Sequence, residues 1–158
     1  MILKPFELNK LDIKKNKMIL LHGKNEGHKN EIINILSRKN ENISNYEEKE
    51  IIENSTQFLE DLFNKSLFDN KKIIIIKRAT DKIIKIIEEI DKKNIDETTI
   101  IINSDTLEKR SKLRIFFEKS KKNICIPFFP DNNQTLVKIS SAYLRGKNIQ
   151  MSLININL

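Results

Sequence analysis

The chain contains few of the residues that mark the more specialised protein classes. Of its 158 residues, three are Gly, three are Pro, one is Cys and none is Trp. So few glycines and prolines exclude a collagen-like or Gly/Pro-rich low-complexity chain, and one Cys excludes a disulfide framework. We expect Cys125, in the apolar run 124–126, to be a small buried residue of a protein in a reducing compartment.

Long apolar runs are also missing. No run approaches the ~20 residues of a membrane span, and no signal-peptide pattern opens the chain. We therefore predict a cytoplasmic protein without a membrane partner. The length suits one domain and part of a second, with a core that needs neither metal nor disulfide.

Histidine is scarce, since His22 and His28 are the two in the chain. With a single Cys and no clustered ligands, we predict no metal site. Neither histidine has a Ser or Cys nucleophile beside it in the sequence, so nothing supports triad chemistry. We expect both side chains to be structural or solvated, with His22 at the end of a strand and His28 on the first turn of a helix.

The net charge of +7 comes mainly from Lys. Residues 41–61 nevertheless carry seven acidic groups and one basic group, which argues against a continuous basic stripe. Direct base readout has little support, because Arg is scarce and no aromatic–basic interleaving occurs. Proximity to DNA stays open.

Two continuous apolar runs predict strands that are buried on both faces, as in parallel sheets covered by helices. These runs are Ile73–Ile76 and Thr98–Ile102. Shorter strands are expected at Met18–His22, near Ile43–Tyr46, and at Asn123–Ile126, the last closed by Pro127 and Pro130.

Helical patterns follow the strands. We expect Asn25, Ser55 and Thr80 each to cap a helix. The residues expected to face the core are Ile32, Ile33, Leu36 and Ile35 in the first helix, and Phe58, Leu59, Leu62 and Phe63 in the second. In the third helix they are Ile83, Ile84, Ile87 and Ile90. Further helices are expected at Leu107–Ser120 and Gln134–Leu144, and Ser152 opens a last apolar stretch.

This alternation predicts an α/β domain in which a parallel sheet lies between two helical layers. We place it at residues 1–131. The remaining residues, 132–158, lack strand patterns and are expected to begin a small helical second domain.

A damaged phosphate loop joins the first strand to the first helix. When G-x-x-x-x-G-K-[ST] is laid on the chain from Gly23, the second Gly falls on His28, the Lys on Lys29 and the Mg²⁺-binding hydroxyl position on Asn30. The architecture is therefore that of a P-loop without the atoms that the chemistry needs. A protein of this kind is expected to bind partners rather than to turn over nucleotide.

The metal-binding acid of P-loop enzymes is also out of place. The strand Ile73–Ile76 ends in Lys77-Arg78, where a cation repels a metal, and Asp105 is the one acid placed similarly, after a neighbouring strand. We predict no catalytic residues and no cofactor. An NTPase with a divergent loop stays open as an alternative.

A Leu-Phe pair follows the helix that starts near Ser55. If that helix runs to Phe68, this ring points away from the stripe of inward-facing residues, as a docking anchor does. If the helix ends earlier, Leu67 and Phe68 tuck under the sheet. Spacing alone leaves both readings open.

Basic residues gather along the expected helix from Asp105 to Arg114. Lys109, Arg110 and Lys112 either form a solvated face or contact a neighbouring subunit or DNA phosphates.

Taken in order, these segments resemble the N-terminal part of the delta subunit of bacterial DNA polymerase III, a component of the clamp loader. The similar segments are Leu20–Gly27, Lys65–Arg78, Leu107–Leu113 (with Glu108 where the family usually has Asp) and the strand exit Pro127–Pro130. The match extends across nearly the whole chain.

The resemblance implies an AAA+-like domain that does not hydrolyse ATP. It implies that Leu67 and Phe68, with Ser66 before them, insert into a hydrophobic pocket of the sliding clamp, the beta subunit, and favour the open ring. It also implies partners in the other clamp-loader subunits (gamma/tau and delta prime) and DNA within the assembled loader. Family members have further domains, of which this chain would hold the start of the second. A basic DNA-binding module remains a further alternative.

Overall fold

A five-stranded parallel sheet forms the centre of the molecule, with the strand order β2-β3-β4-β1-β5. The strands are β1 (Met18–Gly23), β2 (Asn42–Glu47), β3 (Lys72–Lys77), β4 (Thr98–Ser104) and β5 (Ile124–Phe128). This computed structural model describes residues 1–4, 7, 16–38, 42–63, 72–93, 95 and 98–149. The predicted site at Ser66, Leu67 and Phe68 lies outside the described residues.

The strands form where the sequence has β-branched residues in unbroken runs. Ile73–Ile76 in β3 and Ile100–Ile102 in β4 are buried on both faces of the sheet. Each strand thus presents alternate residues to two separate clusters of apolar side chains. The predicted parallel sheet between helices is confirmed.

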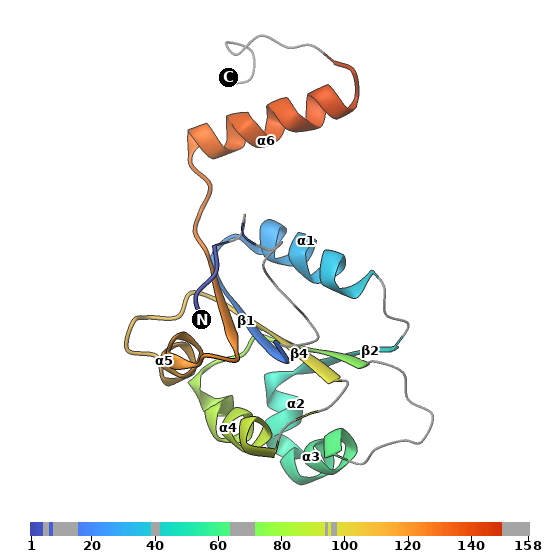
Figure 1. Cartoon of the computed structure of the whole chain (residues 1–158), viewed down its shortest axis with the longest axis vertical. Coiled ribbons are helices and arrows are strands. Elements are labelled where there is room, and N and C mark those ends of the chain that lie inside the picture. Colours follow the sequence, from blue (N-terminus) through green and yellow to red (C-terminus); the bar gives the residue numbers. More distant parts are fainter. Residues whose placement is uncertain are drawn as a thin grey trace. The chain divides into compact units, whose positions relative to one another are not determined.

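The two faces are covered unequally within the described residues (Figure 1). Helix α1 (Glu26–Ser37) packs on one face through Ile32, Ile33 and Leu36. The helices on the other face are α2 (Glu48–Glu53), α3 (Ser55–Phe63), α4 (Ile84–Lys93), which the short helix η2 (Asp81–Ile83) precedes, and α5 (Lys112–Lys119).

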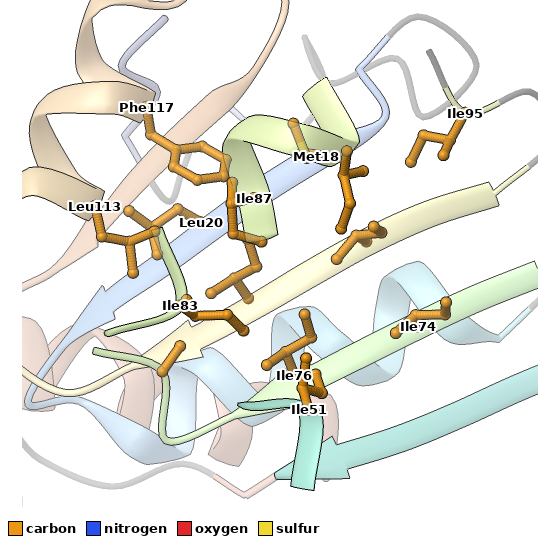
Figure 2. Packing of buried hydrophobic residues seen from close by; sticks show 14 of the residues in the cluster. Met18, Leu20, Ile51, Ile74, Ile76, Ile83, Ile87, Ile95, Leu113 and Phe117 are labelled. Atoms are coloured by element: carbon orange, nitrogen blue, oxygen red, sulfur yellow. The ribbon is translucent and has the colours of Figure 1, made fainter. Parts of the chain in front are cut away.

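The larger core lies between the sheet and this second helical layer (Figure 2). Leu20 and Ile76 of the sheet meet Ile83, Ile87 and Phe117 of the helices there, and all five are essentially inaccessible to solvent. Cys125 is buried in the same cluster, as predicted, and burial raises the pKa of its thiol to about 12.

The helix predicted at Leu107–Ser120 is wrong at its start. The structure has a turn first, closed by a hydrogen bond from Ser111 N to Glu108 O, and α5 begins at Lys112. Ser111 caps the helix, since its hydroxyl accepts from Arg114 N at 3.2 Å. The Ser111 hydroxyl in turn donates to Asp81 Oδ1 at 2.6 Å, so a contact distant in sequence fixes this helix start.

Three smaller predictions are also corrected. Ile35 is 46% exposed rather than directed to the core. Helix α2 occupies residues that had no helical assignment, so Ser55 is the first residue of α3 instead of its cap. Strand β5 continues through Pro127 to Phe128, which an edge strand tolerates because a proline there need not donate to the ladder.

The chain divides into two compact units, Met1–Phe128 and Phe129–Leu158. The second unit contains α6 (Asn133–Gly146), which confirms the helix predicted from Gln134. The side chain of Asn132 caps it by accepting from Thr135 N at 2.9 Å. The domain limits 1–131 and 132–158 stay a prediction, and the apolar stretch from Ser152 lies outside the described residues. Among the described helices, none combines the length and the apolar character required to cross a bilayer.

Candidate functional site

The loop between β1 and α1 is too short to surround a phosphate. Strand β1 ends at Gly23 and α1 begins at Glu26, so that Lys24 and Asn25 alone separate them. Asn25 caps the helix, as predicted, by accepting from His28 N at 3.1 Å. His28, Lys29 and Asn30, which match the end of the phosphate-loop motif, therefore all lie inside the first turns of α1.

Lys29 is fully buried and its ammonium group is bound by the protein itself. Its Nζ donates to the carbonyl oxygen of Ser104 at 2.6 Å and lies 2.5 Å from Glu26 Oε1. Ser104 is the last residue of β4, the neighbour of β1 in the sheet. In open α/β folds the ligand crevice lies at the carboxyl ends of such strands, and here the carbonyl oxygen that ends β4 is bonded to a lysine of the chain itself.

Gly23 lies in close backbone contact with the end of β5. Its backbone has φ +129°, and a Cβ at this position would lie 2.0 Å from the carbonyl oxygen of Phe128. Its N–H donates to the carbonyl oxygen of Asp105 at 3.2 Å. The glycine that matches the start of the motif is thus required by contact between protein backbones.

The two remaining residues of the motif differ in their surroundings. The ring of His28 packs edge-on against Phe128, with centroids 5.1 Å apart. Asn30 is exposed on α1. At the end of β3, Arg78 adopts φ +55° and its Nε donates to Glu47 Oε2 at 2.7 Å. No group of three or more His, Cys, Asp or Glu residues capable of holding a metal occurs in the described part of the chain.

We expect substitution of Lys29 to destabilise the fold without altering any nucleotide affinity. Lys29→Met keeps much of the apolar stem but leaves the Ser104 carbonyl oxygen and Glu26 without their partner, which costs about 1–3 kcal/mol. Lys29→Ala adds a cavity and costs about 2–5 kcal/mol. Urea denaturation measures both values, and a fluorescent ATP analogue measures binding. Loss of ATP binding in a stably folded Lys29→Met variant would contradict the structural role.

Two comparisons with known proteins give no match: no family model matches the chain, and no curated protein matches it in sequence. Solved structures do match. The Bacillus subtilis DNA clamp loader delta protein aligns with 97% of this chain and 50% of its own length, at a TM-score of 0.65 and 14% identity. Domain III of the Thermotoga maritima replication initiation protein DnaA aligns with 97% of this chain and 71% of its own, at a TM-score of 0.47 and 13% identity.

The chain shares its fold with the matching half of the Bacillus subtilis clamp loader delta protein. The resemblance inferred from the sequence is therefore confirmed at the level of the fold. The chain spans about half the length of the delta protein that it matches.

His22 lies near the end of β1, directly before Gly23, and its side chain is only 5% exposed. Its Nε2 has no hydrogen-bond partner among the described residues. Burial, with the positive charge of Arg114 as the next cause, lowers the pKa of this imidazole to about 4, so it is neutral at pH 7. This agrees with the structural role expected for His22.

We expect stability to fall between pH 7 and pH 5 because of His22. The imidazole takes up a proton near pH 6.5 in the unfolded chain but only near pH 4 in the folded one, so in between the unfolded state binds more protons. At pH 5 this amounts to about 2 kcal/mol. Urea denaturation at both pH values, compared with His22→Leu, measures it. A variant that loses as much stability as the wild type would contradict it.

The basic residues predicted as a contact surface do not share a helix face. Lys109 and Arg110 lie in the turn before α5, and Lys112 is the first residue of that helix. All three are exposed, and Arg110 Nε is 2.7 Å from Glu108 Oε2. Lys82 belongs to the same surface, since it lines a hollow together with Arg110 and Ser111.

A cleft of about 900 Å³ lies on the α1 side of the sheet, at the carboxyl ends of β2, β3 and β4. None of the motifs singled out in the sequence pointed to this cleft. Asn45, Lys77 and Asn103 line it, each at or near the end of its strand. Polar residues that end three successive strands were a usable signal, because the carboxyl ends of parallel strands share one edge.

Proposed function

We propose that this chain is the clamp-opening subunit of a DNA polymerase III clamp loader. The fold shared with the delta protein supports the proposal. The phosphate-loop motif supports it as well, because its lysine is bonded to the protein itself. The observation that carries the proposal is the buried ammonium of Lys29, which is bonded to the end of β4 within the fold of a clamp loader protein. A chain built this way needs no nucleotide to complete its core.

Ser66, Leu67 and Phe68 are proposed to contact the sliding clamp. They belong to the segment that connects the end of α3 to the start of β3. Both neighbours are firmly held, because Phe58 of α3 and Ile73 and Ile74 of β3 are buried in the core. A short apolar anchor on rigid supports suits a hot spot, whose few residues supply most of the binding energy.

Ring opening needs no catalysis by this chain. If the anchor binds the open ring more tightly than the closed ring, binding shifts the equilibrium toward opening by the difference in free energy. ATP then acts in the other loader subunits, proposed to be gamma/tau and delta prime, and not in this chain. We propose that Lys109, Arg110 and Lys112 contact a neighbouring subunit or DNA phosphates in the assembled loader, a role suited to exposed cations.

Biolayer interferometry with the immobilised cognate sliding clamp tests the proposal. We expect a Kd of about 1 μM or tighter. The same preparation is expected to hydrolyse no ATP, which separates the proposal from a divergent NTPase. Absence of clamp binding together with ATP turnover would replace it by the NTPase, and DNA affinity that falls steeply with salt in place of clamp binding would favour a DNA-binding module.

A further inference from the structure

Strand β2 forms an edge of the sheet that has no partner among the described residues. The strand order β2-β3-β4-β1-β5 places β2 at one edge and β5 at the other (Figure 1). The chain itself occupies the outer side of β5, because Leu3 N donates to Cys125 O at 3.0 Å and Cys125 N donates to Met1 O at 2.9 Å. No described strand pairs with the outer side of β2. Such an edge presents a row of backbone N–H and C=O groups to which a further strand can bind.

Strand β2 also lacks the features that protect most natural edge strands. Such edges are usually blunted by lysine, by proline or by a bulge, and Asn42–Glu47 contains neither residue type. Its register with β3 is continuous from Asn42 opposite Lys72 to Glu47 opposite Lys77, so no bulge interrupts it. A regular edge of ordinary strand length can therefore pair with an extended segment over its whole length.

The rest of the domain holds this edge in place. The ring of Tyr46 packs edge-on against Phe58 of α3, with centroids 5.2 Å apart. At the end of the strand, Glu47 Oε2 accepts from Arg78 Nε at 2.7 Å. Ile43, which lines the cleft beside α1, is 39% exposed and can pack against a side chain of an added strand. Because the edge is already ordered, binding costs it little conformational entropy.

The charges around β2 select the class of partner. The chain has a net charge of +7, but residues 42–63, which hold β2, α2 and α3, contain six acidic residues and one basic residue. On the other face of the sheet, the cleft beside α1 is lined by more acidic than basic side chains, namely Glu26, Glu47 and Asp105 against Lys77 and Arg78. Acidic surroundings on both faces attract a cationic segment and repel nucleic acid. They also disfavour a second copy of this chain, whose β2 would bring the same negative charge.

We propose that the outer edge of β2 binds an extended, lysine- or arginine-rich segment of a partner protein, which adds a strand to the sheet. Main-chain hydrogen bonds to β2 provide the affinity, and the acidic side chains beside the strand provide the preference for a basic sequence. The inference does not rest on the proposed function, because it uses neither the clamp anchor nor the similarity to the delta protein.

The probe is a fluorescent peptide of alternating lysine and valine, titrated with the purified chain and measured by fluorescence anisotropy. We expect a Kd of about 100 μM or tighter. The same peptide with methylated backbone nitrogens keeps its charges but cannot pair as a strand, and we expect it to bind at least about tenfold more weakly. A peptide of alternating glutamate and valine is expected not to bind. Equal binding of the methylated peptide would overturn strand addition, and binding of the glutamate peptide would overturn the preference for a basic segment.

A matched pair of variants tests the acidic surroundings. Glu50→Gln/Glu53→Gln removes two charges from α2, and glutamine preserves the capping box at the start of that helix. Glu88→Gln/Glu89→Gln is the control on α4, and each double variant loses one ion pair with a lysine four residues away, at Glu53 or at Glu89. The α2 variant is expected to bind the lysine peptide about threefold more weakly or worse, whereas the control stays within about twofold. Equal weakening by the two variants would overturn the placement beside β2.

Proline substitution tests the backbone edge itself. Successive residues of an edge strand direct their N–H groups alternately to the neighbouring strand and away from it, so one of Ser44→Pro and Asn45→Pro leaves the bonds to β3 intact. Thermal melting identifies that variant, because proline is tolerated where the N–H faces outward. We expect it to bind the lysine peptide at least about tenfold more weakly than the wild type.

Wild-type peptide affinity of a folded proline variant would overturn the proposal. If neither proline variant folds, the methylated peptide decides between strand addition and attraction by charge alone. Light scattering without peptide is expected to show no dimer that depends on β2. A wild-type dimer that the folded proline variant converts to a monomer would show that a second copy occupies the edge, and would overturn the basic partner.

Discussion

The double variant Leu67→Ala/Phe68→Ala is expected to bind the sliding clamp several hundred-fold more weakly than the wild-type chain. Two apolar side chains that insert into a partner's pocket lose their buried area on truncation, and hot-spot residues of this kind cost about 2–4 kcal/mol each. Because such values are not additive, we expect a total of about 3–5 kcal/mol. Biolayer interferometry at a series of chain concentrations measures it directly.

The matched control is Phe129→Ala/Leu136→Ala. These side chains are 75% and 48% exposed, and removing them takes away the same two residue types elsewhere on the chain. Their loss is expected to leave clamp affinity within about twofold, as for most residues outside a hot spot. Equal weakening by both double variants would show a general loss of apolar surface and would contradict the anchor.

The melting temperature of the anchor variant decides between the two readings that spacing left open. If Leu67 and Phe68 were tucked under the sheet, each truncation would open a cavity and cost about 2–5 kcal/mol of stability. If they are directed outward, stability changes by less than about 0.5 kcal/mol per side chain. A variant that binds the clamp weakly and also melts far below the wild type would refute the exposed anchor.

The sheet could be predicted from the sequence because its signal is local. Runs of isoleucine bounded by charged residues at Lys72 and Lys77 specify a buried strand without knowledge of the rest of the chain. The Asn25 cap was readable for the same reason, since it involves residues three apart.

The elements that were missed depend on distant contacts. The start of α5 is set by Asp81, which accepts hydrogen bonds from both Ser111 Oγ and Leu113 N. Helix α2 is short and is held at its start by Glu48, whose carboxylate accepts from Thr80 N at 2.6 Å. Neither partner is visible in a local pattern. Tertiary contact therefore decided the start of α5, as it commonly overrides propensity. Helix α2 has a local signal as well, a capping box in which Glu47 N donates to Glu50 Oε2 at 2.9 Å.

The candidate site, too, could be predicted from the sequence only in part. The sequence indicated that the phosphate loop had lost its chemistry, because His28 and Asn30 are the wrong residue types for the motif. It did not indicate where Lys29 would be directed. A lysine that matches a motif can reach a ligand or the protein itself, and only the position of the Ser104 carbonyl oxygen, on a strand far along the chain, distinguishes the two.

Gly23→Ala is expected to destabilise the fold severely. The new Cβ would lie 2.0 Å from the Phe128 carbonyl oxygen and 2.7 Å from its carbonyl carbon, and both are backbone atoms of a strand paired with β1. At φ +129° the residue is in a region that side chains rarely adopt. Removing this clash would require β1 and β5 to separate, so we expect the free energy of unfolding to fall by more than about 4 kcal/mol. That is a large part of the roughly 5–15 kcal/mol that is typical for the unfolding of a domain.

Gly27→Ala is the matched control, since it makes the same change four residues further along. Its Cβ would meet nothing closer than Asn25 Oδ1 at 3.8 Å, and Gly27 lies within α1. Alanine is favoured over glycine in a helix by about 0.5–1 kcal/mol, so this variant should be slightly more stable than the wild type. Urea denaturation of the two variants tests what the glycines of the loop do. If Gly23→Ala unfolds near the wild-type midpoint, the strand contact is not the reason for that glycine, and a role in approaching a phosphate would have to be reconsidered.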